Sequence, residues 1–501
     1  MKMNKNILIL LVSLLLVGSS CSKFLSVNEI NPNNPSAVPA KLILPAALNA
    51  VVRTSNNPDR FRFVYLWYGQ WSIAANYAQP SNLARYNLLA TDYQDAFQEF
   101  YVTGQNLTEI EKVSQNPTEC YYLAIAKIMK VYIMQNLVDI WGDVPYSEAY
   151  KTGEGILKPK YDKQKDIYED LVVQLDKAIK LIQDKPADVT GIPENSDVVY
   201  AGDMTKWLKF ANTLKLRILV HQSTMTGRDT YIKGAIATTA SVGYIGAGES
   251  ALVNPGYISS TDKMNPFYTN YYKADGTQAS DGVTYDLAGK DAVDFLLATA
   301  DPRISKFFNP YKTNLYSGNF LGQSSIPIEA ALTSKLGYNK ADANTMIGLA
   351  TKSSPLLTDF ESLFIQAEAA ERGFITATGK TLYESAVTQS FVYMGLSSAD
   401  AATFLATQKS TVNYDLAVNK ITLLLVQKWV SLNGVAPIEI WTDFRRTGIP
   451  SFLHFSEDPN KLNATPPVRL LYPQREIGVN NDNVVAVGTI SPFTSKIFWQ
   501  N

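Results

Sequence analysis

The chain of 501 residues is long enough for one large domain or for two to three ordinary ones, and 46% of its residues are apolar, which supplies a substantial core. Its 45 lysines and arginines nearly balance its 46 aspartates and glutamates, so the formal net charge is -1. This balance indicates neither a nucleic-acid-binding protein nor a protein held by charge to an anionic membrane surface.

The amino terminus has the order of parts found in a bacterial lipoprotein signal. Two lysines precede the apolar run 7–17, which is too short to span a bilayer, and small residues then lead to Cys21. This order resembles a lipobox. The resemblance implies that residues 1–20 are removed and that Cys21 is diacylated, whereas ordinary secretion without lipidation is the alternative.

Residues 21–40 form a polar stretch that contains prolines, which indicates an extended tether between the lipid and the folded body. Cys120 is the only other cysteine, so no disulfide can form within the chain once Cys21 carries the lipid. The folded part, residues 41–501, is predicted to be a single domain that is stabilised by packing.

Helical periodicity dominates the sequence from Lys41 onward. The pattern predicts a mostly buried aromatic helix over 61–79, followed by a polar loop that carries aromatic residues. A long apolar helix is predicted over 119–141, with Gly142 as its left-handed C-terminal cap and Pro145 preventing its continuation.

Two further helices are predicted from their N-terminal signals. Asp162 is expected to cap a helix with one apolar stripe and with an ion pair between Asp176 and Lys180, four residues apart, on the other face. Asp203 is expected to cap a helix that reaches the region of His221.

The middle of the chain, about 241–350, has a different composition that is rich in glycine, proline, asparagine, serine and tyrosine. It is predicted to be a loop-rich insert, with short strands and short helices, between the helical halves 41–240 and 351–501. Helices resume with a capping box at Thr358 and Glu361. No stretch of strand alternation is long enough to challenge an all-α fold class.

The segment 427–480 is dense in tryptophan, arginine and acidic residues. Glu439 and Asp443 lie four residues apart on a predicted helix, and they are the best candidates for the two carboxylates of a glycosidase. Arg445 and Arg446 adjoin them and would keep both acids ionised, so a structural ion-pair cluster is the preferred interpretation. The sequence shows no nucleophile–histidine–acid set, zinc-ligand spacing or phosphate loop, so we expect no catalysis, no metal and no cofactor.

Seven stretches along the chain carry a family resemblance: WGDVPYSEA (141–149), KWLKFANTLKLRI (206–218), DPRISKFF (301–308), LTDFESLFIQAEAAERG (357–373), VQKWVSLNG (426–434), IWTDFRRTGIP (440–450) and RLLYPQREIGVN (469–480). Together, and in this order, they resemble the SusD/RagB family of nutrient-binding outer-membrane lipoproteins, in particular its SusD-like subgroup. The resemblance spans most of the mature chain.

This resemblance implies a body of tetratricopeptide-like helix pairs, with the loop-rich insert as the ligand-facing part. It implies non-catalytic binding of a nutrient, commonly a glycan or oligosaccharide and in some members a peptide. The implied partner is a TonB-dependent outer-membrane barrel of the SusC type, and the implied location is the outer membrane, anchored through Cys21 and facing the cell surface. A helical glycoside hydrolase or lyase, or a tetratricopeptide-type scaffold that binds only protein, are the alternatives.

Flat aromatic faces beside a few placed polar groups are the expected composition of a sugar-binding surface. The first aromatic loop and the insert both have it. The alternative is that these rings pack in the core. The candidate ligand-binding residues are Asn76, Tyr77, Arg85, Tyr86, Tyr268 and Tyr271.

Overall fold

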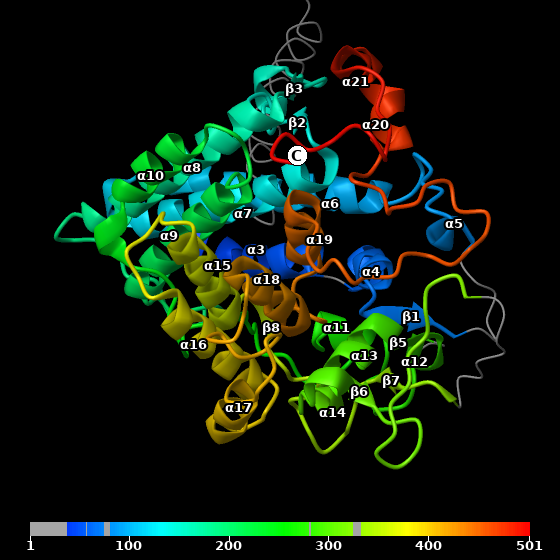
Figure 1. Cartoon of the computed structure of the whole chain (residues 1–501). Coiled ribbons are helices and arrows are strands. Elements are labelled where there is room, and N and C mark those ends of the chain that lie inside the picture. Colours follow the sequence, from blue (N-terminus) through cyan, green and yellow to red (C-terminus); the bar gives the residue numbers. More distant parts are fainter. Residues whose placement is uncertain (1–37, 57, 75–80, 280–281, 324–331, 501) are drawn as a thin grey trace, which may run out of the picture.

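The computed structural model describes residues 38–500 except 57, 75–80, 280–281 and 324–331, and helices dominate it (Figure 1). The predicted signal peptide, the lipidation site Cys21 and nearly all of the predicted tether lie outside the described residues.

The helical body consists of two groups of paired helices. In the first group, α3 (Ala40–Ser55), α6 (Gln94–Val113), α7 (Cys120–Trp141), α8 (Gln164–Gln183), α9 (Met204–His221) and α10 (Asp229–Ala237) pack on one another in chain order. The second group contains α15 (Asp359–Glu371), α16 (Gly379–Tyr393), α17 (Ser398–Leu405) and α18 (Lys420–Ser431), and α15 joins the groups by packing on α9. This architecture confirms the predicted all-α class built on helix pairs.

In the described part of the chain, the strands are short and form three antiparallel sheets. The largest has the order β1 (Trp71–Ile73), β5 (Asp286–Ala288), β7 (Lys335–Leu336) and β6 (Phe308–Asn309). The others pair β2 (Val144–Pro145) with β3 (Tyr161–Asp162) and β4 (Ala251–Val253) with β8 (Ser354–Leu357). The helices α11 (Pro266–Thr269), α12 (Gly282–Tyr285), α13 (Lys290–Thr299) and α14 (Ile304–Phe307) lie beside the four-stranded sheet, at the lower right of Figure 1.

The described chain holds five more α-helices: α4 (Pro58–Trp67), α5 (Ser81–Ala84), α19 (Pro437–Thr447), α20 (Gln474–Val479) and α21 (Asn481–Val487). Helix α19 packs on α4, α7 and α9, so the carboxy-terminal part of the chain lies against the first half of the body. Across the described ranges, no helix has both the length and the apolar character needed to cross a membrane.

The prediction of one aromatic helix over 61–79 is wrong. Helix α4 ends at Trp67, and the chain turns at Gly69, whose φ of 70° favours glycine. The residues that follow form β1, which pairs with β5 more than two hundred residues later in the sequence. The aromatic residues of 61–71 are buried as expected, but Trp71 is buried in a strand.

Two predicted contacts of helix α8 are also wrong. Asp162 does not cap the helix, because its carboxylate accepts a 2.7 Å hydrogen bond from the backbone N–H of Ser147. Asp176 does not pair with Lys180 but with Lys215 of α9, at 2.5 Å. Both acids bind residues outside α8, and the spacing of residues within one helix cannot predict such contacts.

Several local predictions are confirmed. Asp203 caps α9 by accepting a hydrogen bond from the N–H of Thr205 at 2.9 Å. Gly142 ends α7 as predicted and has a positive φ of 79°, but its ψ of -122° lies outside the left-handed helical region. Thr358 accepts from the N–H of Glu361 at 3.3 Å, as the first half of a capping box requires. The second half is missing, because the Glu361 carboxylate accepts instead from Arg217, at 3.0 Å.

Candidate functional site

The two carboxylates considered for glycosidase chemistry lie in a buried ion-pair network. Lys428 of α18 stands between them, with Nζ 2.9 Å from Glu439 Oε1 and 2.8 Å from Asp443 Oδ2. Nε2 of His221 lies 3.0 Å from Glu439, and Arg446 lies 2.7 Å from Asp443. The side chains of Glu439 and Asp443 are only 5% and 8% exposed, so a polysaccharide cannot reach them.

The charges around Glu439 do not suit a proton donor of the kind that a glycosidase needs. Burial alone would raise the pKa of Glu439, but Lys428, His221 and Arg217 outweigh it and hold that pKa well below its usual range. A general acid for glycoside cleavage needs a raised pKa instead. The structural ion-pair interpretation of Glu439 and Asp443 is confirmed.

The adjoining residues connect α19 to the rest of the body. Arg445 Nη1 donates to the carbonyl oxygens of Asp139 at 2.6 Å and of Val468 at 2.8 Å. Trp441 is fully buried, and its Nε1 donates to the carbonyl oxygen of Pro467 at 3.1 Å. The segment 427–480 therefore joins parts of the chain that are far apart in sequence.

The first group of predicted ligand-binding residues is only partly within the structure. Asn76 and Tyr77 lie outside the described residues. Arg85 follows α5, its Nε lies 3.2 Å from Asp458, and its side chain is 41% exposed. Tyr86 is fully buried, and its hydroxyl accepts a 2.7 Å hydrogen bond from the N–H of Ser456. Of these two described residues, Arg85 alone offers an accessible side chain.

The second group, Tyr268 and Tyr271, lies in the core of the insert, where the rings are 4% and 2% exposed. The Tyr271 hydroxyl donates to Asp286 Oδ2 of β5 at 3.1 Å. Tyr268 packs on Tyr272, with ring centroids 5.5 Å apart. Both rings lie where the alternative interpretation, packing in the core, expects them. Their part in ligand binding stays a prediction.

An aromatic and cationic surface that we did not predict lies close to Arg85. The ring of Phe320 is 4.7 Å from that of His454, whose side chain is 63% exposed. Lys290 Nζ lies 5.8 Å from the Phe320 ring centroid. Asp291 fixes His454, because it accepts hydrogen bonds from the backbone N–H at 2.9 Å and from Nδ1 at 2.6 Å. We name the surface formed by Arg85, Lys290, Phe320, His454 and Asp458 the Phe320 face.

Backbone contacts hold the parts of the Phe320 face together. The N–H of Glu457 donates to the carbonyl oxygen of Leu321 at 2.8 Å, and the N–H of Leu462 donates to that of Arg85 at 2.9 Å. Gly322 makes the first contact possible, since a Cβ there would come within 2.6 Å of Ser456 Oγ. The segment 454–458 therefore places His454 beside Phe320 at one end and Asp458 beside Arg85 at the other.

The chemistry of the Phe320 face suits a polyhydroxy ligand. A partly exposed ring such as that of Phe320 can stack on the C–H face of a sugar, and guanidinium, ammonium and imidazole groups can donate to its hydroxyls. Where side chains are described, no group of three or more histidine, cysteine or acidic residues is arranged to hold a metal ion. Four separate segments supply the face, around residues 85, 290, 320 and 454–458, so no local motif could have shown it.

Comparisons with known proteins agree on the fold. The family model described as "Starch-binding associating with outer membrane" matches residues 32–473. The chain superposes on a chitin-binding protein with a TM-score of 0.75 at 22% sequence identity, covering 92% of this chain and 100% of the other. A SusD homolog from Bacteroides uniformis gives 0.74 at 21% identity, covering 92% and 99%.

A chitin-binding SusD homolog from Flavobacterium johnsoniae also gives a TM-score of 0.74 at 21% identity, covering 91% of this chain and 98% of the other. At such identities, the likeness to these structures shows a shared fold. No protein with a curated function matches the sequence significantly.

Proposed function

The chain belongs to the SusD-like family, which is described as starch-binding and as associating with the outer membrane, and on this basis we propose that it binds a glycan or oligosaccharide nutrient there without catalysing a reaction. The match of the family model over residues 32–473 is the observation that carries this proposal. The burial and pairing of Glu439 and Asp443 support a role without catalysis.

The proposed nutrient is delivered to a TonB-dependent barrel of the SusC type, and the proposed anchor is a lipid on Cys21 that holds the protein at the cell surface. The family resemblance supports both points. Co-expression with a barrel of this type, followed by purification from the outer membrane, tests the partnership, because the two proteins should then elute together. A barrel that elutes without this chain would remove the partner from the proposal.

We place the ligand at the Phe320 face, with Arg85 retained from the residues predicted from sequence. Phe320 supplies the apolar platform, and Arg85 and His454 supply donors for sugar hydroxyls. Asn76 and Tyr77 stay candidates, since they lie only a few residues before Arg85 in the chain.

Phe320→Ala is predicted to weaken glycan binding about fivefold, because loss of one stacking ring costs on the order of 1 kcal/mol. Isothermal titration calorimetry with maltohexaose and with chitohexaose measures the change, since the related proteins are described as starch- or chitin-binding. Tyr231→Ala, which removes a partly buried ring on α10, is the matched control and should leave the affinity unchanged.

The outcomes separate three functions. Binding that Phe320→Ala does not weaken would remove the Phe320 face from the site. If neither oligosaccharide nor any other glycan binds while a peptide does, the cargo is a peptide instead. New reducing ends from a polysaccharide panel, abolished by Glu439→Gln, would replace the binding function with a hydrolase.

A further inference from the structure

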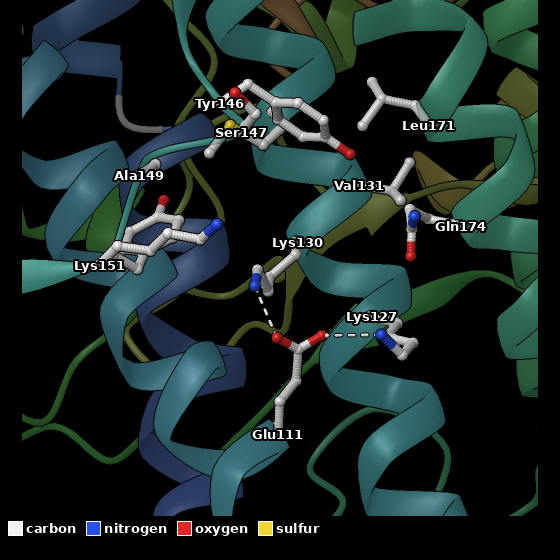
Figure 2. Close-up of a pocket in the computed structure, with 12 residues that line it drawn as sticks. Glu111, Lys127, Lys130, Val131, Tyr146, Ser147, Ala149, Lys151, Leu171 and Gln174 are labelled. Carbon is white, nitrogen blue, oxygen red and sulfur yellow. Dashed lines mark hydrogen bonds and ion pairs between the residues drawn. The ribbon is translucent and has the colours of Figure 1, made fainter. Parts of the chain in front are cut away.

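A basic pocket opens among α6, α7 and α8 of the helical body (Figure 2). These helices lie in the upper half of Figure 1, whereas the four-stranded sheet lies at the lower right. The pocket has a volume of about 230 Å³. Sites for drug-sized ligands usually have about 300–1,000 Å³, so this pocket fits one small ring or group and not a polymer.

Positive charge dominates the pocket. Figure 2 shows Glu111 of α6 joined to two lysines of α7, with Oε2 2.6 Å from Lys130 Nζ and Oε1 3.4 Å from Lys127 Nζ. Each lysine side chain is about one quarter exposed, at 25% for Lys127 and 24% for Lys130, so solvent screens the charges only in part. One carboxylate therefore serves two ammonium groups.

Lys151 adds a third ammonium group to the wall of the pocket. Its side chain makes no hydrogen bond or ion pair with any residue that the structure describes. Two further acids contact lining residues without lining the pocket themselves. Asp170 accepts hydrogen bonds from the Tyr146 hydroxyl at 2.5 Å and from Gln174 at 3.2 Å, and Asp162 accepts one from the Ser147 hydroxyl at 2.9 Å. Among the residues that line the pocket, three lysines therefore face a single carboxylate, that of Glu111.

Two tyrosines give the same pocket an aromatic wall. Lys130 Nζ lies 5.3 Å from the ring centroid of Tyr150. The Tyr150 backbone has a φ of 65°, and its hydroxyl is buried without a hydrogen-bond partner among the described side and main chains. Gly104 accommodates this ring, because a side chain at that position would collide with the Tyr150 hydroxyl. Such a strained and unsatisfied residue persists only where the surroundings enforce it, and such residues cluster at functional sites.

We propose that this pocket binds an acidic sugar unit, such as a uronic acid. The carboxylate of the sugar would pair with Lys151 and with the positive charge that Glu111 leaves unbalanced on Lys127 and Lys130. The ring of the sugar would lie against Tyr146 and Tyr150. This second site stands apart from the Phe320 face, and it does not depend on the function proposed for that face.

The test is a titration of the full chain with D-glucuronate at low ionic strength, in which ligand-observed NMR measures the binding. Glucose is the matched neutral ring and inorganic sulfate is the matched anion without a ring. Glucuronate should bind more tightly than either. Lys151→Gln should weaken glucuronate binding about tenfold or more, because hydrogen bonds to charged groups are the strong ones.

Two further variants make the test specific. Glu111→Gln should tighten glucuronate binding, because it removes the carboxylate that competes for Lys127 and Lys130. Lys180→Gln removes the same charge from the far end of α8, where the side chain is 77% exposed, and should change nothing. Maltohexaose binding should be the same in all three variants, which distinguishes this site from the Phe320 face.

Three results would overturn the proposal. Equal binding of glucose would show that the charge is not used, and equal binding of sulfate would show that the rings are not used. An unchanged affinity in Lys151→Gln would show that glucuronate binds elsewhere.

Discussion

Glu368 of α15 is an acid whose charge stabilises the fold. Arg446 binds both of its oxygens, with Nη1 2.6 Å from Oε1, and Arg372 Nε donates to Oε1 at 2.8 Å. Burial alone would raise the pKa of Glu368, but Arg446 and Arg372 lower it to about 2, from an ordinary value of 4.5.

This pKa predicts acid sensitivity in a defined window. Because the folded-state pKa is the lower one, the unfolded chain binds more protons between pH 4.5 and 2, so the contribution of Glu368 is full above pH 4.5 and is lost as pH falls toward 2. The loss is about 3 kcal/mol. Urea unfolding across this range measures it, and Glu368→Gln should flatten the slope. An equal slope in the variant would contradict the assignment.

The turn between α4 and β1 shows why a strand that pairs with a distant part of the chain is harder to predict than a helix. The stretch LWYGQW (66–71) around Gly69 continues an apolar run, and local periodicity alone extends the helix. Pairing of Trp71 with Ala288, and of Ser72 with Leu287, overrides that local preference. By contrast, α7 and α9 were predicted well because their caps and apolar faces are encoded within the helices themselves.

Gly69→Ala is predicted to destabilise the protein by about 1–3 kcal/mol, because alanine is strained at a φ of 70°. A Cβ there would also come within 2.4 Å of Asp291 Oδ2. Since Asp291 fixes His454, glycan affinity should fall as well. Gly234→Ala in α10, where a Cβ meets nothing within 4 Å, is the control and should be neutral or slightly stabilising in thermal unfolding. Equal melting temperatures for the two variants would contradict the role of the turn.

At the scale of the whole molecule, the fold was more predictable than the site. The all-α class follows from helical periodicity, which each segment shows by itself. The Phe320 face needs the contacts of Phe320 with His454 and of Arg85 with Asp458, which no local pattern relates. Tyr86, Tyr268 and Tyr271 have the composition of a sugar site, but burial decides whether a ring can meet a ligand, and burial depends on the complete fold.

The carboxy-terminal segment 427–480 holds that fold together through Trp441. The Trp441 ring meets Phe63 of α4 edge to face at 5.3 Å, and the guanidinium of Arg445 lies 4.1 Å from its centroid. Trp441→Ala should cost about 3–5 kcal/mol, because it removes a large, fully buried side chain. Trp441→Phe, which keeps a ring but loses the bond to Pro467, should cost less.

Because Trp441 is remote from solvent and is not part of the Phe320 face, the loss in Trp441→Ala should appear in stability and not in binding. Calorimetric unfolding measures the first, and titration with the bound glycan well below the melting temperature measures the second. An unchanged melting temperature together with lost affinity would place the ligand at α19 instead. The expected result, lower stability with normal affinity, assigns the segment to the architecture that positions the site.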